Sequence, residues 1–345
     1  MDKTKSYVMK TVIKSFFLII IIIGGCTGKM QENYIMTVKG HVEANKTGIW
    51  LTHEHILVDF IDADSITPGR YNRSEVINKT LPFLRTIKEL GCKTFVECTP
   101  QYLGRDIEIL RALSDSTGMN ILTNTGFYGA NNNRYIPSSV MSMSPEQMAE
   151  IWIGEWEKGI GETGIKPGFI KISVDPGPLS DFHAKLVKAA AMTHLKTGLT
   201  IASHTGPAVP AFQEIELLKE YGVDPSAFIW VHASGEKDYS KIVEAAKQGT
   251  WISIDNLNDN NVQEVIDIIQ YLKEAGHLGR VLVSHDAGYY DPSKEDGGSF
   301  RPLTTLFEKL IPELKLKGFS DSEIKQLIEK NPIEAFTVKI RKIKH

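Results

Sequence analysis

Short runs of β-branched and aromatic residues alternate along the chain with longer stretches that have the period of an amphipathic helix. Eight of the short runs predict strands, at residues 48–53, 94–99, 121–126, 169–174, 200–205, 228–233, 250–255 and 281–286. The helical stretches are 74–90, 106–117, 145–161, 181–196, 209–221, 240–248, 262–275 and 301–317. A short helix at 321–330 and a turn from Asn331-Pro332 follow. Strand and helix therefore alternate from residue 48 onward.

This regular alternation predicts an α/β fold of parallel strands joined by right-handed helical crossovers. Eight such units over about 240 residues match the size of a closed (β/α)8 barrel. We therefore predict a single TIM-barrel domain at residues 36–345. An open, doubly wound sheet is the alternative fold. It is disfavoured because no Gly-x-Gly-x-x-Gly motif follows the first strand and its switch point offers no candidate site.

The amino terminus has the pattern of a secretory signal peptide. Four lysines precede the apolar run 16–23, and Gly24-Gly25-Cys26 follows it. The run is shorter than the roughly 18 apolar residues that a membrane-spanning helix needs. The segment IGGC resembles the lipobox of bacterial lipoproteins, which implies cleavage of residues 1–25 and lipidation of Cys26. We then expect an exported protein, held at the cell envelope by a tether at 26–35. An ordinary signal peptide with a chance cysteine is the alternative.

Composition and charge restrict the class of partner. The chain is 42% hydrophobic and 23% charged, as in ordinary globular domains, and its 39 basic and 42 acidic residues give a net charge of −3. No basic cluster follows the first 15 residues, so the sequence lacks the electrostatic footprint of a nucleic-acid-binding protein. We expect a small-molecule substrate. Cys92 and Cys98 are expected to be buried free thiols, because a strand holding Cys98 points its side chain away from Cys92.

Side chains that can bind metal ions recur at the carboxyl ends of the predicted strands. His53 and His55 end the first strand two residues apart, so both face the barrel axis while Glu54 faces away. Further candidate ligands come from the fourth, fifth, sixth and eighth strands: Lys171, His204, His232 and Asp286. TIM-barrel active sites lie at this rim. Four of the ten histidines of the chain are thereby brought to one place.

Lys171 lies inside a strand that is expected to be buried, which is unfavourable for an ammonium ion. A neutral lysine amine can act as a base, or it can react with carbon dioxide to form a carbamate, which resembles a carboxylate ligand. The alternative is a lysine that reaches solvent or pairs with Glu97 or Asp175. Four imidazoles, one carboxylate and one carbamate suffice for two divalent ions, with Zn²⁺ the expected metal. The sequence thus predicts a binuclear centre.

The chain from about residue 36 to 337 resembles the phosphotriesterase family of the amidohydrolase superfamily, through its segments LTHEH, GFIK, SHTG, VHASG and SHDAG. The resemblance implies that His53, His55 and Asp286 bind the more buried metal. By the same resemblance, His204 and His232 bind the more exposed metal, and carboxylated Lys171 and a hydroxide bridge the two. It also implies hydrolysis of a lactone, a carboxylic ester or a phosphoester.

Further roles follow for residues around the predicted centre. The segment TGFYG is similar to the lactonase branch of the family, which implies that Tyr128 lies near the bridging hydroxide. Asp286 is placed to accept a proton as the hydroxide attacks and to pass it on. Glu97 is either hydrogen-bonded to a metal-bound histidine or Lys171, or part of a buried ion pair. His285 is expected to be structural. Barrels of this kind are often dimers, so a homodimer is expected.

The loops after the strands are expected to select the substrate. The segments 128–143 and 287–302 are long, and paired tyrosines and glycines suggest a mobile lid in the second. After the seventh strand the chain has DNLND where lactonases of the family usually have Asp-Arg, and SGE follows the sixth strand in place of the usual Gly-Asp. With Tyr128, Tyr289 and Tyr290 as substrate-binding residues, this polar rim suits a hydroxylated substrate such as a sugar lactone or ester.

Two other readings of the same residues remain. A lipid-anchored barrel could bind a ligand in this cleft without turning it over, although no ligand or proton shuttle is missing. A mononuclear, deaminase-like amidohydrolase also begins with His-x-His, and Lys171 argues against it. The number of metal ions bound per chain separates the second reading from a binuclear hydrolase.

Overall fold

The structure, a computed structural model, describes residues 33–67 and 69–344. The predicted signal peptide, the predicted lipidation site at Cys26 and most of the predicted tether lie outside the described residues. Within the described ranges, no helix combines the length and the apolar character needed to cross a membrane.

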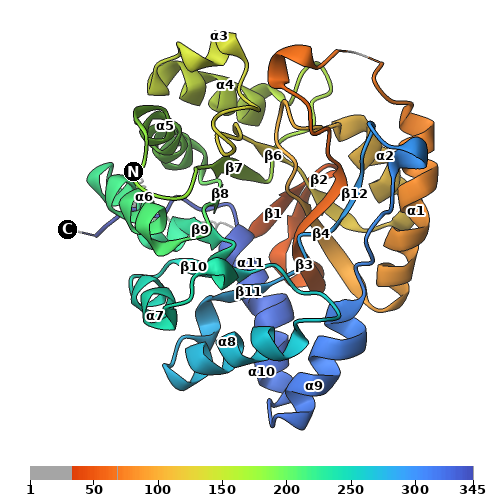
Figure 1. The fold of residues 1–345 in the computed structure, drawn as a ribbon, viewed down its shortest axis with the longest axis vertical. Helices are drawn as coiled ribbons and strands as arrows, with labels where there is room; N and C mark the ends of the chain where they lie inside the picture. The colour runs from red at the N-terminus through yellow and green to blue at the C-terminus, as the bar shows by residue number, and fades with distance from the viewer. Residues whose placement is uncertain (1–32, 68, 345) are drawn as a thin grey trace, which may run out of the picture. The chain divides into compact units, whose positions relative to one another are not determined.

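Parallel strands form the centre of the fold, with helices around them (Figure 1). The strands are β3 (Ile49–Leu57), β4 (Cys92–Glu97), β5 (Asn120–Leu122), β6 (Asn124–Thr125), β7 (Phe169–Ser173), β8 (Ile201–His204), β9 (Phe228–Val231), β10 (Trp251–Ile254) and β11 (Val281–Val283). β3 to β5 form one parallel series and β6 to β11 another. Only Thr123 separates β5 from β6, and beyond β11 the amide of Asp286 donates to the carbonyl of His53 at 3.0 Å. The two series thereby close into a barrel of the TIM type.

Helices connect successive strands and pack outside the barrel. They are α1 (Arg73–Glu89), α2 (Ile107–Thr117), α4 (Pro145–Lys158), α5 (Asp181–Thr197), α6 (Ala208–Glu220), α7 (Tyr239–Lys247) and α8 (Val262–Glu274), with a short α3 (Ser138–Met141) before α4. Local side chains fix where they begin. Asp106 accepts hydrogen bonds from two amides in the first turn of α2, and Ser144 forms a capping box with Gln147 at the start of α4. All eight predicted strands and these seven long helices overlap their observed counterparts.

The predicted helix at 301–317 begins later than expected. Residues 301–304 are not helical, and the helix consists of a π-helical segment at Leu306–Leu310 continued by α9 (Ile311–Leu316). Pro302 accounts for the conformation at Arg301, because a proline disfavours helical backbone at the residue before it. Arg301 is therefore part of the preceding loop. The chain continues with α10 (Asp321–Lys325) and, after a second π-helical segment, α11 (Asn331–Phe336).

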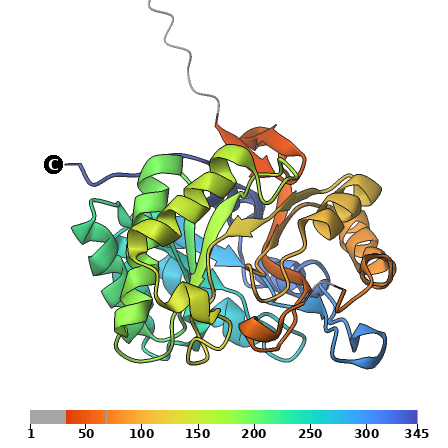
Figure 2. The same cartoon turned by 90° about the horizontal axis from the view of Figure 1, so that it is seen from above.

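An antiparallel hairpin that the sequence pattern did not predict lies at one end of the barrel (Figure 2). It consists of β1 (Tyr34–Thr37) and β2 (Gly40–Glu43), so Tyr34 and Ile35 belong to the fold and not to the predicted tether. Ile35 packs in an apolar cluster inside the barrel with Trp50, Phe169 and Phe336. This cluster fills the end of the barrel where the strands begin, which leaves the opposite end for polar side chains.

A bulge in β3 sets the direction of its histidines. Leu51 pairs with Phe95 and Glu54 pairs with Glu97, so an advance of three residues along β3 is matched by two residues along β4. β3 therefore contains one extra residue at this point. Trp50 faces the barrel interior, and without the extra residue His53 would point outward. The extra residue reverses the alternation of inward and outward side chains. His53 and His55 therefore face inward, as predicted, and Glu54 faces outward.

The two described cysteines are free and buried, as predicted. Cys98 belongs to the cluster inside the barrel, and Cys92 belongs to the larger core between the barrel and its helices. Burial raises the pKa of the Cys92 thiol to about 12, so this side chain stays neutral and packs as a small apolar group.

Gly126, directly after β6, is required where the chain passes close to Lys171. Its φ angle is +126°, and a Cβ atom added there would lie 1.9 Å from the carbonyl oxygen of Lys171. We predict that Gly126→Ala lowers the free energy of unfolding by at least about 2 kcal/mol, through backbone strain and displacement of the strand. The change in the midpoint of urea unfolding measures this effect.

Gly154→Ala provides the matched control. Gly154 lies inside α4, and an added Cβ would meet no atom within 4 Å. This variant should be as stable as the parent, or more stable by up to about 1 kcal/mol, because alanine favours a helix. Equal unfolding midpoints for Gly126→Ala and the parent would contradict the assigned close approach.

Candidate functional site

A pocket of about 180 Å³ lies at the carboxyl ends of the barrel strands. It is lined by all six predicted metal ligands: His53, His55, Lys171, His204, His232 and Asp286. Six further residues complete its wall: Val58, Phe60, Leu103, Tyr128, Tyr289 and Arg301. Side chains far apart in the sequence therefore meet in one place, because parallel strands bring their carboxyl ends to the same rim.

One group of donor atoms gathers around Asp286. Its Oδ1 atom lies 3.0 Å from Nε2 of His55 and 3.5 Å from Nε2 of His53. These three side chains each offer one ligand atom within 4.8 Å of the others. The amine of Lys171, whose side chain is 1% exposed, lies 3.4 Å from the same nitrogen of His53. The arrangement is compact enough for one ion, with the lysine on its inner side.

A second group of donors lies beside the first. Nε2 of His232 and Nδ1 of His204 are 2.7 Å apart, and the hydroxyl of Tyr128 lies 2.9 Å from Nδ1 of His204. The rings of His53 and His232 are 5.1 Å apart between centroids, so the two groups are adjacent. His232 has a φ angle of +61°, which turns the chain sharply at the end of β9. This turn carries the imidazole over the pocket.

The buried carboxylate of Asp255 orients one imidazole from each group. Its two oxygens lie 2.8 Å from Nδ1 of His53 and 2.8 Å from Nδ1 of His232, and its side chain is fully buried. Each ring therefore donates its Nδ1 proton to Asp255 and presents Nε2 to the pocket. These three side chains are close enough to hold an ion themselves. We interpret them as an orienting set, because both carboxylate oxygens already accept an imidazole N–H.

The role of Asp255 was missed by sequence analysis, which placed this residue in a substrate loop. The available signal was its position, since it immediately follows β10 at the same rim as the ligands. Thr99 acts in a similar way on His55, with 2.8 Å between the threonine hydroxyl and Nδ1 of the ring. Three of the four imidazoles thus have a protein partner on their far side from the pocket.

Both predictions for Glu97 are wrong. Its carboxylate accepts hydrogen bonds from the amides of Ile56 and Thr99, and it bonds neither to Lys171 nor to any of the four histidines. The physical reason is the register of β4, which pairs Glu97 with outward-facing Glu54 and so points it away from the barrel interior. It also forms no ion pair within residues 33–67 and 69–344. Burial raises the pKa of Glu97 to about 7.

Glu54 holds the backbone on both sides of Asp286. One oxygen accepts the amide of His285 at 3.0 Å and Nδ1 of its ring at 2.6 Å, and the other accepts the amide of Ala287 at 3.1 Å. Asp286 itself has a φ angle of +49°, an unusual conformation for a residue with a side chain. The Nε2 atom of His285 accepts the amide of Leu306. The predicted structural role of His285 thus fits its contacts.

Burial and neighbouring charges shift the pKa values of the site residues. Although burial opposes it, the neighbouring carboxylate of Asp255 raises the pKa of His232. Burial, followed by the nearby Lys171 charge, lowers the pKa of His53 to about 4. Burial and the neighbouring His232 also lower the pKa of His204. Although burial opposes it, the histidines His53 and His55 hold the pKa of Asp286 below its usual value. At neutral pH His53 and His204 are therefore neutral and Asp286 is a carboxylate, as metal ligands must be.

The three predicted substrate-binding tyrosines separate into two sets. Tyr128 and Tyr289 line the pocket, and the ring of Tyr289 packs edge-on against Phe60 at 5.6 Å. Tyr290 does not line it. It is buried in the outer core, with its ring against Gly297, because successive residues of β12 (Gly288–Tyr290) point to opposite faces. The loop that we predicted as a lid is thus partly a strand, which pairs with β3.

A second lobe of about 400 Å³ adjoins the pocket. It shares Phe60, Leu103, Tyr128 and His204 with the pocket and adds polar groups of Asn131, Asn132 and Asp175. The polar segment expected to form the rim, residues 255–259, lines neither space. The side chains of Asn258 and of Asn261, two residues past this segment, instead bind main-chain atoms of Asn256 and Asn258.

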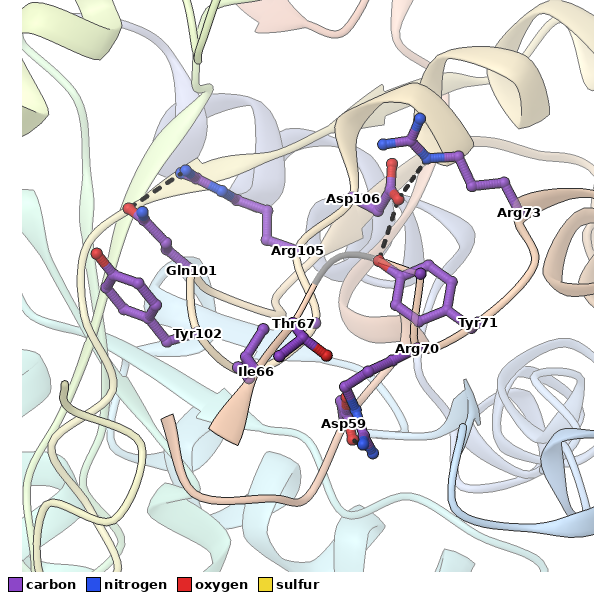
Figure 3. Close-up of a pocket in the computed structure, with 12 residues that line it drawn as sticks. Asp59, Ile66, Thr67, Arg70, Tyr71, Arg73, Gln101, Tyr102, Arg105 and Asp106 are labelled. Carbon is purple, nitrogen blue, oxygen red and sulfur yellow. Dashed lines mark hydrogen bonds and ion pairs between the residues drawn. The ribbon is translucent and has the colours of Figure 1, made fainter. Parts of the chain in front are cut away.

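A larger pocket of about 590 Å³ lies outside this site (Figure 3). Its cationic side chains are already paired. Arg70 binds Asp59 through two hydrogen bonds, and Arg73 and Tyr71 both bind Asp106. No histidine lines this pocket, so despite its larger size it is not a candidate for the metal site.

Comparison with known proteins agrees with this geometry. The phosphotriesterase family pattern matches residues 33–336. The chain is 28% identical over 295 residues to a phosphotriesterase homology protein of Escherichia coli, covering 84% of this chain and 98% of that protein. It is 27% identical over 321 residues to an aryldialkylphosphatase of Saccharolobus solfataricus, covering 87% and 98% of the two chains. A mutant PTE-like lactonase of Deinococcus radiodurans has a similar structure, with a TM-score of 0.79, 25% identity and coverage of 88% and 99%.

The family match extends from the first hairpin to the last helix of the fold, and it includes every strand that contributes to the pocket. The barrel, the cluster of histidines with Asp286, and these relatives all lead to the same conclusion: the chain belongs to the phosphotriesterase family and is a metal-dependent hydrolase.

Proposed function

We propose that this hydrolase uses two divalent metal ions, with Zn²⁺ as the first candidate, to cleave a lactone or carboxylic ester. The observation that carries the proposal is the convergence of six potential ligands at one rim, with three of the four imidazoles oriented from behind by Asp255 and Thr99. The donor set fits first-row divalent ions, which prefer imidazole and carboxylate ligands. His53, His55 and Asp286 would hold one ion, and His204 and His232 would hold the other.

When bound, such ions lower the pKa of a shared water molecule toward neutrality and polarise the oxygen of the scissile group. The protein supplies the remaining functions. The free oxygen of Asp286 is placed to accept the proton that the attacking water loses, and its strained backbone fixes that oxygen at the rim. Tyr128, with its hydroxyl next to His204, is placed to hydrogen-bond a substrate oxygen.

We also propose that Lys171 is carboxylated. Its side chain is buried, its amine faces Nε2 of His53, and it forms no ion pair with another described residue. The partners that would explain an unmodified lysine are engaged elsewhere: Glu97 faces outward, and Asp175 accepts the amides of Asn131 and Asn132. Addition of carbon dioxide to the neutral amine forms an N–C bond and releases one proton. The product is an anionic ligand in place of a buried cation.

The substrate space favours a small molecule with hydrogen-bonding groups. The inner pocket is small and partly aromatic, whereas the adjoining lobe presents Asn131, Asn132 and Asp175. A hydroxylated lactone or ester fits this division, with its polar part in the outer lobe. A phosphoester is the second candidate, since the relatives include an aryldialkylphosphatase as well as a PTE-like lactonase.

We further propose that the protein is exported, anchored through Cys26 and dimeric. The first 26 residues support export and anchoring, through their lysines, apolar run and IGGC segment. The alternatives, a non-catalytic barrel and a mononuclear enzyme, are distinguished by turnover and by the number of metal ions bound per chain.

Cys26→Ser tests the anchor. If Cys26 carries the lipid, this variant should move from the membrane fraction to the soluble fraction, because it loses the acyl chains. Fractionation of cells producing each form, followed by immunoblotting, provides the measurement. A variant that still partitions with membranes would contradict the lipidation.

Asp286→Asn tests the proton-transfer role. The variant keeps the shape of the side chain and one ligand oxygen but removes the carboxylate as a proton acceptor. We predict two metal ions per chain in the parent, retained metal in the variant, and a decrease in kcat of about 10²–10⁴-fold. Elemental analysis and steady-state kinetics on lactones and aryl esters provide the test. One metal ion per parent chain, or full turnover by the variant, would refute these assignments.

Asp255→Asn tests the orienting set. The amide can accept from only one ring through its oxygen, so one imidazole loses its partner. We predict a decrease in metal affinity of about 10–100-fold, measured by competition with a chromophoric chelator. Asp259→Asn is the matched control from the same segment, because Asp259 binds exposed Lys309 and lies outside the pocket. Equal metal affinities for the two variants would show that Asp255 is not needed to orient the ligands.

A further inference from the structure

Arg301 is a cation of the pocket wall that the metal chemistry does not use. It lies at the end of the loop after β11 and lines the same pocket as the six candidate ligands. Its main-chain amide donates to the carbonyl of Gly288, and Gly288 pairs with His55 across β12 and β3. The backbone under Arg301 is therefore tied to the strand that carries two of the ligands. This connection makes it a fixed part of the wall.

The guanidinium group is positioned by neutral groups. It donates to the main-chain carbonyl of Asp286, and its central carbon lies 5.4 Å from the centre of the Tyr289 ring. Tyr289 is itself held edge-on against Phe60 and has a φ angle of +59°. A carbonyl and an aromatic face fix the orientation of the cation without neutralising its charge.

Arg301 differs in this respect from several other arginines of the described residues. Arg70, Arg105 and Arg134 each bind a carboxylate, namely Asp59, Glu155 and Asp62. Among residues 33–67 and 69–344, Arg301 forms no ion pair. One of its five N–H donors is engaged by Asp286, so a planar edge remains for a ligand. Such an edge matches the two oxygens of a carboxylate, sulfonate or phosphate group.

The rest of the pocket wall provides few other groups that could bind an anion. Apart from the histidines and Asp286, its wall consists of Val58, Phe60, Leu103, the two tyrosines and Lys171, and the lysine is 1% exposed. Within the described part of the wall, Arg301 is thus the accessible permanent cation. Because the scissile group must lie at the metal-ligand end, a second group of the substrate is left to meet Arg301.

We propose that the substrate carries an anionic group, separate from the bond that is cleaved, and that Arg301 binds this group. The inference rests on the proposed ester or lactone hydrolysis and narrows it to anionic substrates. Arg301 then determines specificity: it selects among esters that the metal centre can cleave equally well.

A matched pair of substrates tests the proposal in the metal-loaded, full-length protein. The para-nitrophenyl ester of butyric acid is neutral, and the mono-para-nitrophenyl ester of glutaric acid carries a carboxylate at the far end of its acyl chain. We expect the parent to prefer the anionic ester by at least about 10-fold in kcat/KM, and Arg301→Gln to lower that preference by about 10–100-fold. Arg301→Lys should retain part of the preference, because it keeps the charge but loses the planar edge.

Arg111→Gln is the control, since Arg111 is an exposed arginine of α2 that pairs with Asp115, outside the pocket. It should leave the preference at the parent value. Equal losses on both esters in Arg301→Gln, or no preference in the parent, would overturn the proposal. The first result would assign Arg301 a purely structural role in holding the Asp286 loop.

A binding measurement separates this proposal from the proposed function. Methanesulfonate is an anion that coordinates metal ions weakly, and its affinity can be determined by thermal-shift titration of the metal-loaded protein. We expect the affinity to fall by at least about 10-fold in Arg301→Gln and to be unchanged in Arg111→Gln. If neither ester is hydrolysed but this difference is found, ester hydrolysis is refuted and anion binding stands. If the esters are hydrolysed but methanesulfonate affinity does not depend on Arg301, the anion site is refuted.

Discussion

The site depends on one buried carboxylate that is shared between two imidazoles. Removing a carboxylate from water is costly unless hydrogen-bond donors replace the solvent, and Asp255 receives the rings of His53 and His232, the hydroxyl of Ser253 and a main-chain amide. These donors come from three strands, β3, β9 and β10, or directly follow them. The same bonds that stabilise the carboxylate therefore fix the distance between the two groups of ligands. A substitution at Asp255 therefore affects the orientation of ligands in both groups.

Unusual backbone conformations concentrate at the same rim. His232, Asp286 and Tyr289 all have positive φ angles, and all three line the pocket. Such conformations cost about 1–3 kcal/mol each for residues with side chains, so they persist only where other contacts hold them. Glu54 provides these contacts next to Asp286, by accepting the amides on both sides of it. The outward-facing residue of the His-Glu-His segment thus positions a ligand from another strand.

The repeating pattern of the sequence predicted the barrel and the rim because both follow from local periodicity and from parallel strands. It did not predict the direction of a side chain where that direction depends on the exact register of a strand or on contacts with residues distant in sequence. The alternation along β4 turns Glu97 outward, and Tyr289 and Tyr290, which are adjacent in β12, point to opposite faces. The hairpin before β3 has no helix partner, so it did not fit the repeating pattern. Arg301 was not predicted as a pocket residue because the sequence pattern placed it at the start of a helix, whereas it lies in the loop before Pro302.

Chemistry and selectivity come from different parts of this chain. The candidate ligands lie on the strands or within three residues of their ends, where the barrel itself determines their positions. The other pocket residues lie past the ends of the barrel strands: Val58 and Phe60 after β3, Leu103 after β4, Tyr128 after β6, Tyr289 on the short strand β12 and Arg301 in the loop after it. Loops can change without disturbing the barrel, so relatives with the same ligands can act on different substrates. The proposed anion site at Arg301, a cation beside the ring of Tyr289, would narrow the range of substrates further than the metal centre alone.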